Sequence, residues 1–359
     1  MRYDLGQDWL HVLCICMSTH ISINRQEEAI GKKHLSMKKS FLKFMTISLL
    51  TAMSMAVNAG IIVYTDGDFK YSLETETKTA ALSKYSGSAT EVTIPESVTH
   101  DDVTYSVTRL GDKCFSYCSS LTSIDIPSSV TSLGYKCFSG CESLTSIDIP
   151  SSVTSLGIAC FFECTSLTSI TIPSSVTSLG DYCFSGCSSL TSIDIPSSVT
   201  SLGEGCFYGC SALTSIDIPS SVTSLGNYCF SDCSSLTSID IPSSVTSLGD
   251  YCFSGCNSIK TMTCEIPTAI EGYFFSETPI YDATLYVPEA SLDSYKTTYP
   301  WNGFGEILPI SPDGIEEIAT DGDAGIDAIY NLEGKRCNGT NRGLNIIRMS
   351  DGTTRKVLK

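Results

Sequence analysis

The chain has 359 residues, a formal net charge of −17 and 18 cysteines. The charge is uneven, because residues 60–323 hold 8 Lys or Arg against 32 Asp or Glu, whereas residues 324–359 hold 7 against 3. An acidic body repels nucleic-acid phosphates and anionic membrane surfaces, so sequence-independent binding of DNA or RNA is disfavoured. Basic proteins and cations are the charged partners that such a body favours.

The first 59 residues differ in kind from the rest. A basic segment that begins at Met37 precedes an apolar run, and Val57-Asn58-Ala59 supplies the small residues of a cleavage site. This order predicts a secretory signal peptide over residues 37–59. Residues 1–36 carry mixed charges, and we interpret them as a mis-assigned extension upstream of the true start. The alternative, a transmembrane anchor over residues 44–59, is short for a membrane span.

A 23-residue unit then repeats along the middle of the chain, close to L-T-S-I-D-I-P-S-S-V-T-S-L-G-x-x-C-F-x-x-C-x-S. A decayed copy begins at Ile259, the stretch from Cys114 to Ser120 closes an earlier unit, and the clearest copies begin at Leu121, Leu144, Leu167, Leu190, Leu213 and Leu236. A period of this length predicts a solenoid, in which stacked turns build a continuous core.

Each unit contains an alternating segment such as Ile124-Asp125-Ile126, the pattern of a strand with one buried face. Stacked units therefore predict a parallel sheet, and Pro127 ends the strand because it has no N–H for the ladder. Val130 and Leu133 form a second apolar stretch, and Gly134 permits a turn. The recurring Leu, Ile, Ile, Val, Leu, Cys, Phe and Cys positions are predicted to form ladders of core side chains.

These repeats resemble the BspA-type leucine-rich repeats of bacterial surface proteins over roughly residues 85–275. Ser129 and Thr131 stand where the general leucine-rich pattern has Asn or Cys and then Leu, which favours a flatter, β-richer turn. The resemblance implies a β-rich α/β leucine-rich repeat solenoid, a right-handed superhelix of 23-residue turns with a small C-terminal β unit. Residues 60–84 are expected to cap its N-terminal end, with Tyr105-Ser106-Val107-Thr108 pairing back onto the stack.

Residues 276–311 resemble the closing segment of that family, and Trp301 and Phe304 are expected to pack in this cap. An acidic linker over residues 312–323 follows. Residues 324–359 alternate apolar with polar residues, and Asp351-Gly352 is a hairpin signal. This last unit resembles the sorting domain read by the type IX secretion system, which implies recognition by export and sorting machinery. An ordinary C-terminal β unit without a sorting role is the alternative.

The cysteines recur as Cys-x-x-x-Cys pairs, such as Cys137 and Cys141. Equivalent cysteines in adjacent turns would have parallel Cα–Cβ vectors, which leaves their Cβ atoms too far apart for a relaxed disulfide. Buried thiols that fill core volume are the preferred interpretation, while disulfides and zinc sites remain as alternatives. Because His100 is the only histidine after the signal peptide and no phosphate-binding motif is present, we expect the chain not to be an enzyme and to need no cofactor.

Two rows of residues are candidate binding sites. The first is acidic and interrupted once by Thr171, and it favours a positively charged partner or, more weakly, calcium; it comprises Asp125, Asp148, Asp194, Asp217 and Asp240. The second is an aromatic stripe suited to sugars or proteins, formed by Tyr182, Tyr228 and Tyr251. A solvated polar face and partly shielded aromatic residues are the alternatives without a ligand.

By resemblance, the sequence predicts a secreted or outer-surface bacterial protein that adheres to host matrix or other surface proteins. A carbohydrate-binding or nutrient-capture protein that uses the tyrosine stripe is the second hypothesis. A structural spacer in a surface layer is the third.

Overall fold

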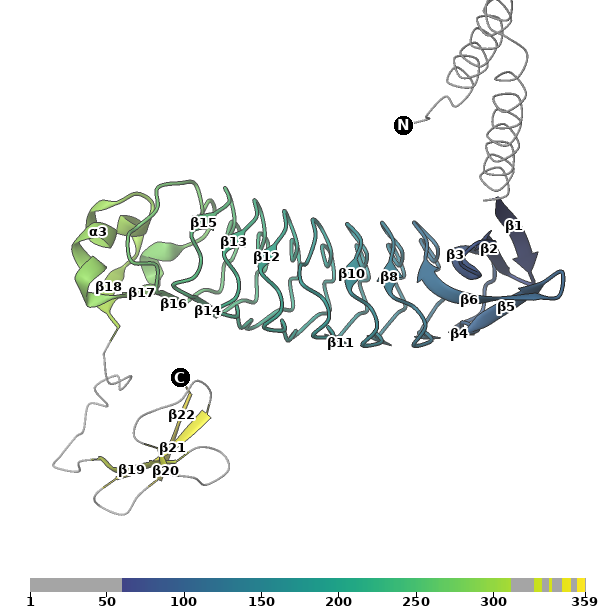
Figure 1. Cartoon of the computed structure of the whole chain (residues 1–359). Coiled ribbons are helices and arrows are strands. Elements are labelled where there is room, and N and C mark those ends of the chain that lie inside the picture. The colour runs from purple at the N-terminus through teal and green to yellow at the C-terminus, as the bar shows by residue number, and fades with distance from the viewer. Residues whose placement is uncertain (1–59, 311–325, 331–335, 338–343, 350–353, 359) are drawn as a thin grey trace, which may run out of the picture. The chain divides into compact units, whose positions relative to one another are not determined.

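The computed structural model describes residues 60–310 and the backbone of four further strands between residues 326 and 358. The proposed extension, the signal peptide and the acidic linker fall outside the described residues. Within residues 60–310 the repeats stack turn upon turn from β6 (Val103–Leu110) to β18 (Glu306–Pro309), as Figure 1 shows. No helix in the described part of the chain is long and apolar enough to cross a membrane.

The I-D-I segments form the expected parallel ladder along one side of the stack. Ile124 and Ile126 point inward with 8% and 6% of their surface exposed, while Asp125 between them is exposed. Single bridges join Thr171 to Asp194 and Asp217 to Asp240. In the described repeats the pairing is interrupted between Asp125 and Asp148 and between Asp194 and Asp217. Its named strands are β4 (Glu91–Thr93), β7 (Ser123–Asp125), β9 (Ser146–Asp148), β11 (Ser169–Thr171), β14 (Ser238–Ile241), β16 (Thr261–Cys264), β17 (Thr284–Val287) and β18 (Glu306–Pro309).

A second parallel ladder runs along another side, where the sequence predicted only an apolar stretch. It begins with the long strand β6 (Val103–Leu110) and runs as far as Leu156. The pairing is interrupted between Leu156 and Leu179 and resumes with a bridge from Leu179 to Leu202. The remaining members are two-residue strands, each ending in a leucine: β8 (Ser132–Leu133), β10 (Ser155–Leu156), β12 (Ser201–Leu202), β13 (Ser224–Leu225) and β15 (Ser247–Leu248). Two residues of alternation are too few to show a period, so the sequence could not distinguish a strand here.

Hydrogen-bonded turns, with no α-helix in the described repeats, close each unit on its third side. The N–H of Phe138 donates to the Cys160 carbonyl of the next turn at 2.8 Å, while the N–H of Cys137 donates to Gly134 within its own turn at 3.3 Å. These turns require residues with positive φ, such as Lys136 (51°) and Gly140 (74°). Gly134 is not among them, but a hydrogen-bonded turn begins at this residue, as the sequence predicted. It is small because a Cβ there would lie 2.6 Å from the Asp112 backbone nitrogen of the preceding turn.

The core consists of the predicted ladders of identical side chains. Phenylalanines stack at the centre from Phe115 to Phe275, with successive ring centroids 5.4–5.8 Å apart. The leucine, valine and cysteine ladders surround them, and nearly all of these side chains are buried. All described cysteines are free thiols.

Both ends of the stack are covered. At the N-terminal end, the Tyr85 ring packs against that of Phe115 with centroids 5.2 Å apart and planes tilted by 30°, and β6 pairs back onto the stack as expected. The strands that build this cap are β1 (Ile61–Asp66), β2 (Phe69–Glu74) and β3 (Thr79–Tyr85), which form an antiparallel meander, and β5 (Ser97–His100), which forms a hairpin with β6.

At the C-terminal end the first ladder continues through β17 and β18, past residue 275. Trp301 is fully buried and Phe304 is 6% exposed, which confirms that both pack in the cap. The cap also contains the helical segments η1 (Ile280–Asp282), η2 (Glu289–Ser291), α3 (Leu292–Thr297) and η3 (Trp301–Gly303).

The tail contains the expected strands, and they form an antiparallel sheet in the order β20-β19-β21-β22. The predicted hairpin corresponds to the pairing of β21 with β22. The four strands are β19 (Ile326–Tyr330), β20 (Arg336–Cys337), β21 (Leu344–Met349) and β22 (Thr354–Leu358).

Candidate functional site

The five candidate aspartates lie in one row on the outer surface of the first ladder, which we call the acidic face. Strand alternation turns each carboxylate outward, opposite flanking isoleucines that are buried or, for Ile195, partly buried. Thr171 pairs with Asp148 on one side and Asp194 on the other, so the row is interrupted there, as the sequence predicted. Adjacent members of such a ladder are about 4.8 Å apart, which keeps the carboxylates close enough to repel one another.

The hydroxyl groups beside the acidic face are engaged in stacking the turns. Thr168 Oγ1 donates to the Thr145 carbonyl of the preceding turn at 3.2 Å, and Thr237 Oγ1 donates to Thr214 at 3.2 Å. Thr122 Oγ1 makes the equivalent bond to Thr90 at 2.9 Å. These bonds hold neighbouring turns together, so the hydroxyl groups have a structural role. The carboxylates are the charged groups of the face.

The charge around the acidic face is almost entirely negative. Residues 137–259 contain ten Asp or Glu and no Lys or Arg. The resulting field favours the approach of a positively charged surface. For calcium the geometry offers no support, because in the part of the chain that the structure describes no group of three or more His, Cys, Asp or Glu side chains is arranged to hold a metal ion.

The candidate tyrosines do not form a continuous stripe. Tyr228 and Tyr251 stack with their centroids 5.1 Å apart and their planes within 11°. Gly205 occupies the same place in the intervening turn, so Tyr182 is separated from this pair. The Tyr182 hydroxyl instead donates to the Glu204 carboxylate, and this bond raises the pKa of Tyr182 to about 12.

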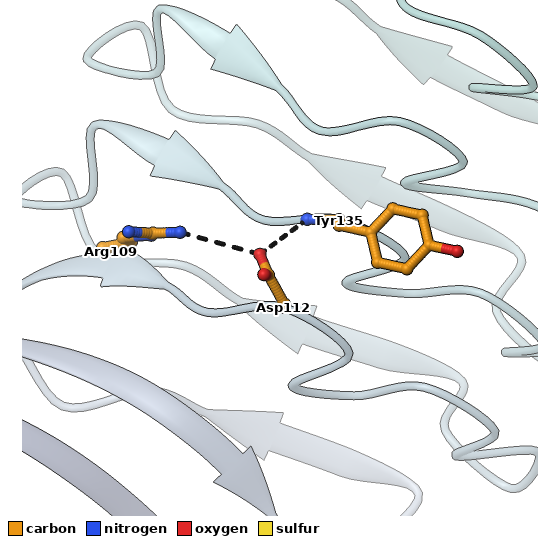
Figure 2. A network of polar contacts seen from close by, with 3 residues as sticks. All are labelled: Arg109, Asp112 and Tyr135. Atoms are coloured by element: carbon orange, nitrogen blue, oxygen red, sulfur yellow. Dashed lines mark hydrogen bonds and ion pairs between the residues drawn. The ribbon is translucent and has the colours of Figure 1, made fainter. Parts of the chain in front are cut away.

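Several of the variable residues after the repeat glycines hold neighbouring turns together. Asp112 Oδ1 accepts a hydrogen bond from the Tyr135 N–H at 3.0 Å and lies 3.6 Å from Arg109 Nη2, as Figure 2 shows. The side-chain oxygens of Asp181 and Asn227 accept equivalent bonds from the next turn at 2.9 Å. The sequence did not reveal this role, because tyrosine, isoleucine and glutamate occupy the same place in other turns.

The thiols and the histidine have structural partners. Cys141 Sγ donates to the Phe115 carbonyl at 3.2 Å, and every later repeat has the same bond from its second cysteine. Burial raises the pKa of Cys183 to about 12, which keeps the thiol protonated and unreactive near neutral pH. His100 lies at the end of β5, where its ring packs 4.6 Å from that of Tyr64 and its Nε2 atom lies 3.4 Å from Asp101.

Sequence reasoning missed a pocket beside the C-terminal cap. It has a volume of about 280 Å³, and tyrosines from three separate segments line it: Tyr251, Tyr273 and Tyr299. Tyr273 lies at the end of the expected repeat region (residues 85–275) and Tyr299 in the expected cap (residues 276–311). Only the loss of the repeat pattern around these two tyrosines, together with their aromatic character, could have drawn attention to them.

Comparisons with known proteins agree with the repeat architecture. A family model described as the BspA type leucine rich repeat region matches residues 81–200 and 177–295, with six copies. No curated protein matches the sequence significantly.

Solved structures of bacterial leucine-rich repeat proteins are also similar. A leucine rich repeat protein from T. pallidum is 29% identical, with a TM-score of 0.49 over 55% of this chain and 90% of that one. A leucine rich cell surface protein from Faecalibacterium prausnitzii is 24% identical, with a TM-score of 0.39 over 70% and 95% of the two chains. A leucine-rich repeat protein from Bacteroides ovatus is 24% identical, with a TM-score of 0.42 over 68% and 76%.

Proposed function

Because the chain belongs to the BspA-type leucine-rich repeat family, we propose that it is a non-enzymatic protein of the bacterial outer surface that binds other proteins through its acidic face. The observation that carries this proposal is the single row of five outward carboxylates on a ladder whose spacing the stacked turns fix. A rigid row of like charges suits a partner with several lysines or arginines, because each added contact forms at a high effective concentration.

Adhesion to host matrix or to other surface proteins is the role that we propose for this binding. Export would depend on the signal peptide over residues 37–59, and sorting on the β unit formed by residues 324–359. A row of outward carboxylates repeated along the stacked turns suits contact with an extended partner.

The test is binding of the full chain to an array of host matrix proteins and to a lysine-rich peptide. In one variant all five aspartates of the acidic face become asparagine. A matched control removes the same number of charges from exposed glutamates elsewhere, with glutamine at Glu74, Glu76, Glu96, Glu142 and Glu163.

The asparagine variant should lose affinity by roughly tenfold or more, and the loss should shrink as salt screens the charges. The glutamine control should change affinity much less, although the two variants have the same net charge. Equal losses would show a general charge effect and contradict a dedicated face, and unchanged binding in both variants would place the contact elsewhere.

A further inference from the structure

We propose that the pocket beside the C-terminal cap binds a neutral hexopyranose unit, a site distinct from the acidic face and independent of it. The pocket combines Tyr251 from the last regular turn, Tyr273 from the loop that follows it, and Tyr299 from the segment before η3. Ser276 and Asn302 contribute polar groups to the same lining. The Tyr273 and Tyr299 rings meet edge to face, with centroids 6.1 Å apart.

These tyrosines are not needed to close the core. Trp301 is fully buried, Phe275 is 7% exposed, and Trp301 Nε1 donates to the Ile270 carbonyl at 2.8 Å, so the cap is sealed beneath the pocket. Tyr273 and Tyr299 nevertheless keep 62% and 58% of their surfaces exposed. Two large aromatic rings that pack together on the exposed surface, where the core does not need them, are typical of a surface that contacts a ligand.

The chemistry of the lining favours a sugar. A tyrosine ring packs against the C–H face of a pyranose, while its hydroxyl and the Asn302 amide can bond to the sugar hydroxyls. The volume of about 280 Å³ is close to the lower end of the range for small-molecule sites, about 300–1,000 Å³, and suits one ring better than an extended peptide.

The surrounding charge favours an uncharged sugar. None of the lining residues is basic, and Asp250, Glu277 and Asp282 lie next to or close to them in the sequence. An anionic sugar such as a sialic acid would meet repulsion and would have no arginine or lysine in the lining to neutralise it.

The experiment titrates the full chain with methyl hexopyranosides and with neutral disaccharides, and measures binding by ligand-observed NMR and calorimetry. Tyr273→Ala and Tyr299→Ala remove the proposed platform at exposed positions, where the fold should tolerate the change. Tyr281→Ala is the matched control, because Tyr281 lies in η1 of the cap and is 69% exposed but does not line the pocket. Thermal melts establish that all three variants stay folded.

At least one neutral sugar should bind, and Tyr273→Ala or Tyr299→Ala should weaken it at least tenfold while Tyr281→Ala leaves it unchanged. Tyr273→Trp should retain binding, because it restores an aromatic face. The proposal would be overturned if no neutral sugar bound at millimolar concentration, or if the two alanine variants bound the sugar as well as the unchanged protein does. Because the acidic face is intact in these variants, a failure here would leave the proposed protein binding untouched.

Discussion

The rings of Phe161 and Phe184 lie one above the other in adjacent turns, with centroids 5.5 Å apart and planes within 2°. Each ring is fully buried, and each has an equivalent ring on its other side. Every turn therefore depends on its neighbours for the packing of its largest core side chain.

Removal of one ring from the middle of this stack should lower the stability of the protein strongly. Phe184→Ala should lower the free energy of unfolding by about 3–5 kcal/mol, because it removes a buried ring and leaves a cavity between two turns. Urea denaturation of the full chain measures this loss. A decrease below about 1 kcal/mol would show that the stack collapses around the gap and that the rings are not the main support of the turns.

Two repeat glycines at equivalent positions should respond differently to the same change. A Cβ added at Gly203 would lie 2.6 Å from the Asp181 backbone nitrogen, whereas one added at Gly180 would find its nearest neighbour 3.8 Å away. Gly203→Ala should therefore destabilise the protein by about 1–3 kcal/mol. Gly180→Ala should be neutral or slightly stabilising, because it restricts the unfolded chain. Equal melting temperatures for the two variants would contradict the close approach of turns at Gly203.

The bond from the Glu204 N–H to Asp181 Oδ1 gives a further test. Asp181→Ala removes the acceptor and should cost about 0.5–1.5 kcal/mol. Asp181→Asn should restore most of the stability, since Asn227 makes the same bond to Asp250 in a later turn. If alanine and asparagine gave the same thermal midpoint, the acceptor would have no stabilising role.

Buried thiols should make the protein less stable in alkali. The pKa of Cys183 is about 12 in the folded chain, whereas an unfolded thiol titrates near about 8.5. Above that lower value the unfolded chain binds fewer protons than the folded one, so the free energy of unfolding falls as pH rises. The full contribution is present below about pH 8.5 and is lost progressively up to the folded pKa.

Urea midpoints measured between pH 7.5 and 10.5 should change little below about pH 8.5 and then decrease, and Cys183→Ala should reduce the slope of that decrease. A midpoint that did not change over this range would contradict the presence of buried, protonated thiols.

The repeat period was sufficient to predict most of the fold. Ile124-Asp125-Ile126 identified the strand, its buried face and the outward aspartate. The alternation of apolar and polar residues within the segment and its repetition in successive units both predicted the same strand. The second ladder was missed because Ser132 and Leu133 are too short a segment to show a period. The pocket was missed because Tyr273 and Tyr299 come together only through the folding of the irregular cap.

The proposed surface binding requires that the protein act outside the bacterial cell, and intact-mass analysis of the protein recovered from fractionated native cells tests this directly. We predict a surface or released species that begins at Gly60 and lacks part or all of residues 324–359. A cytoplasmic, full-length chain that retains Met1 would contradict the proposed surface binding protein.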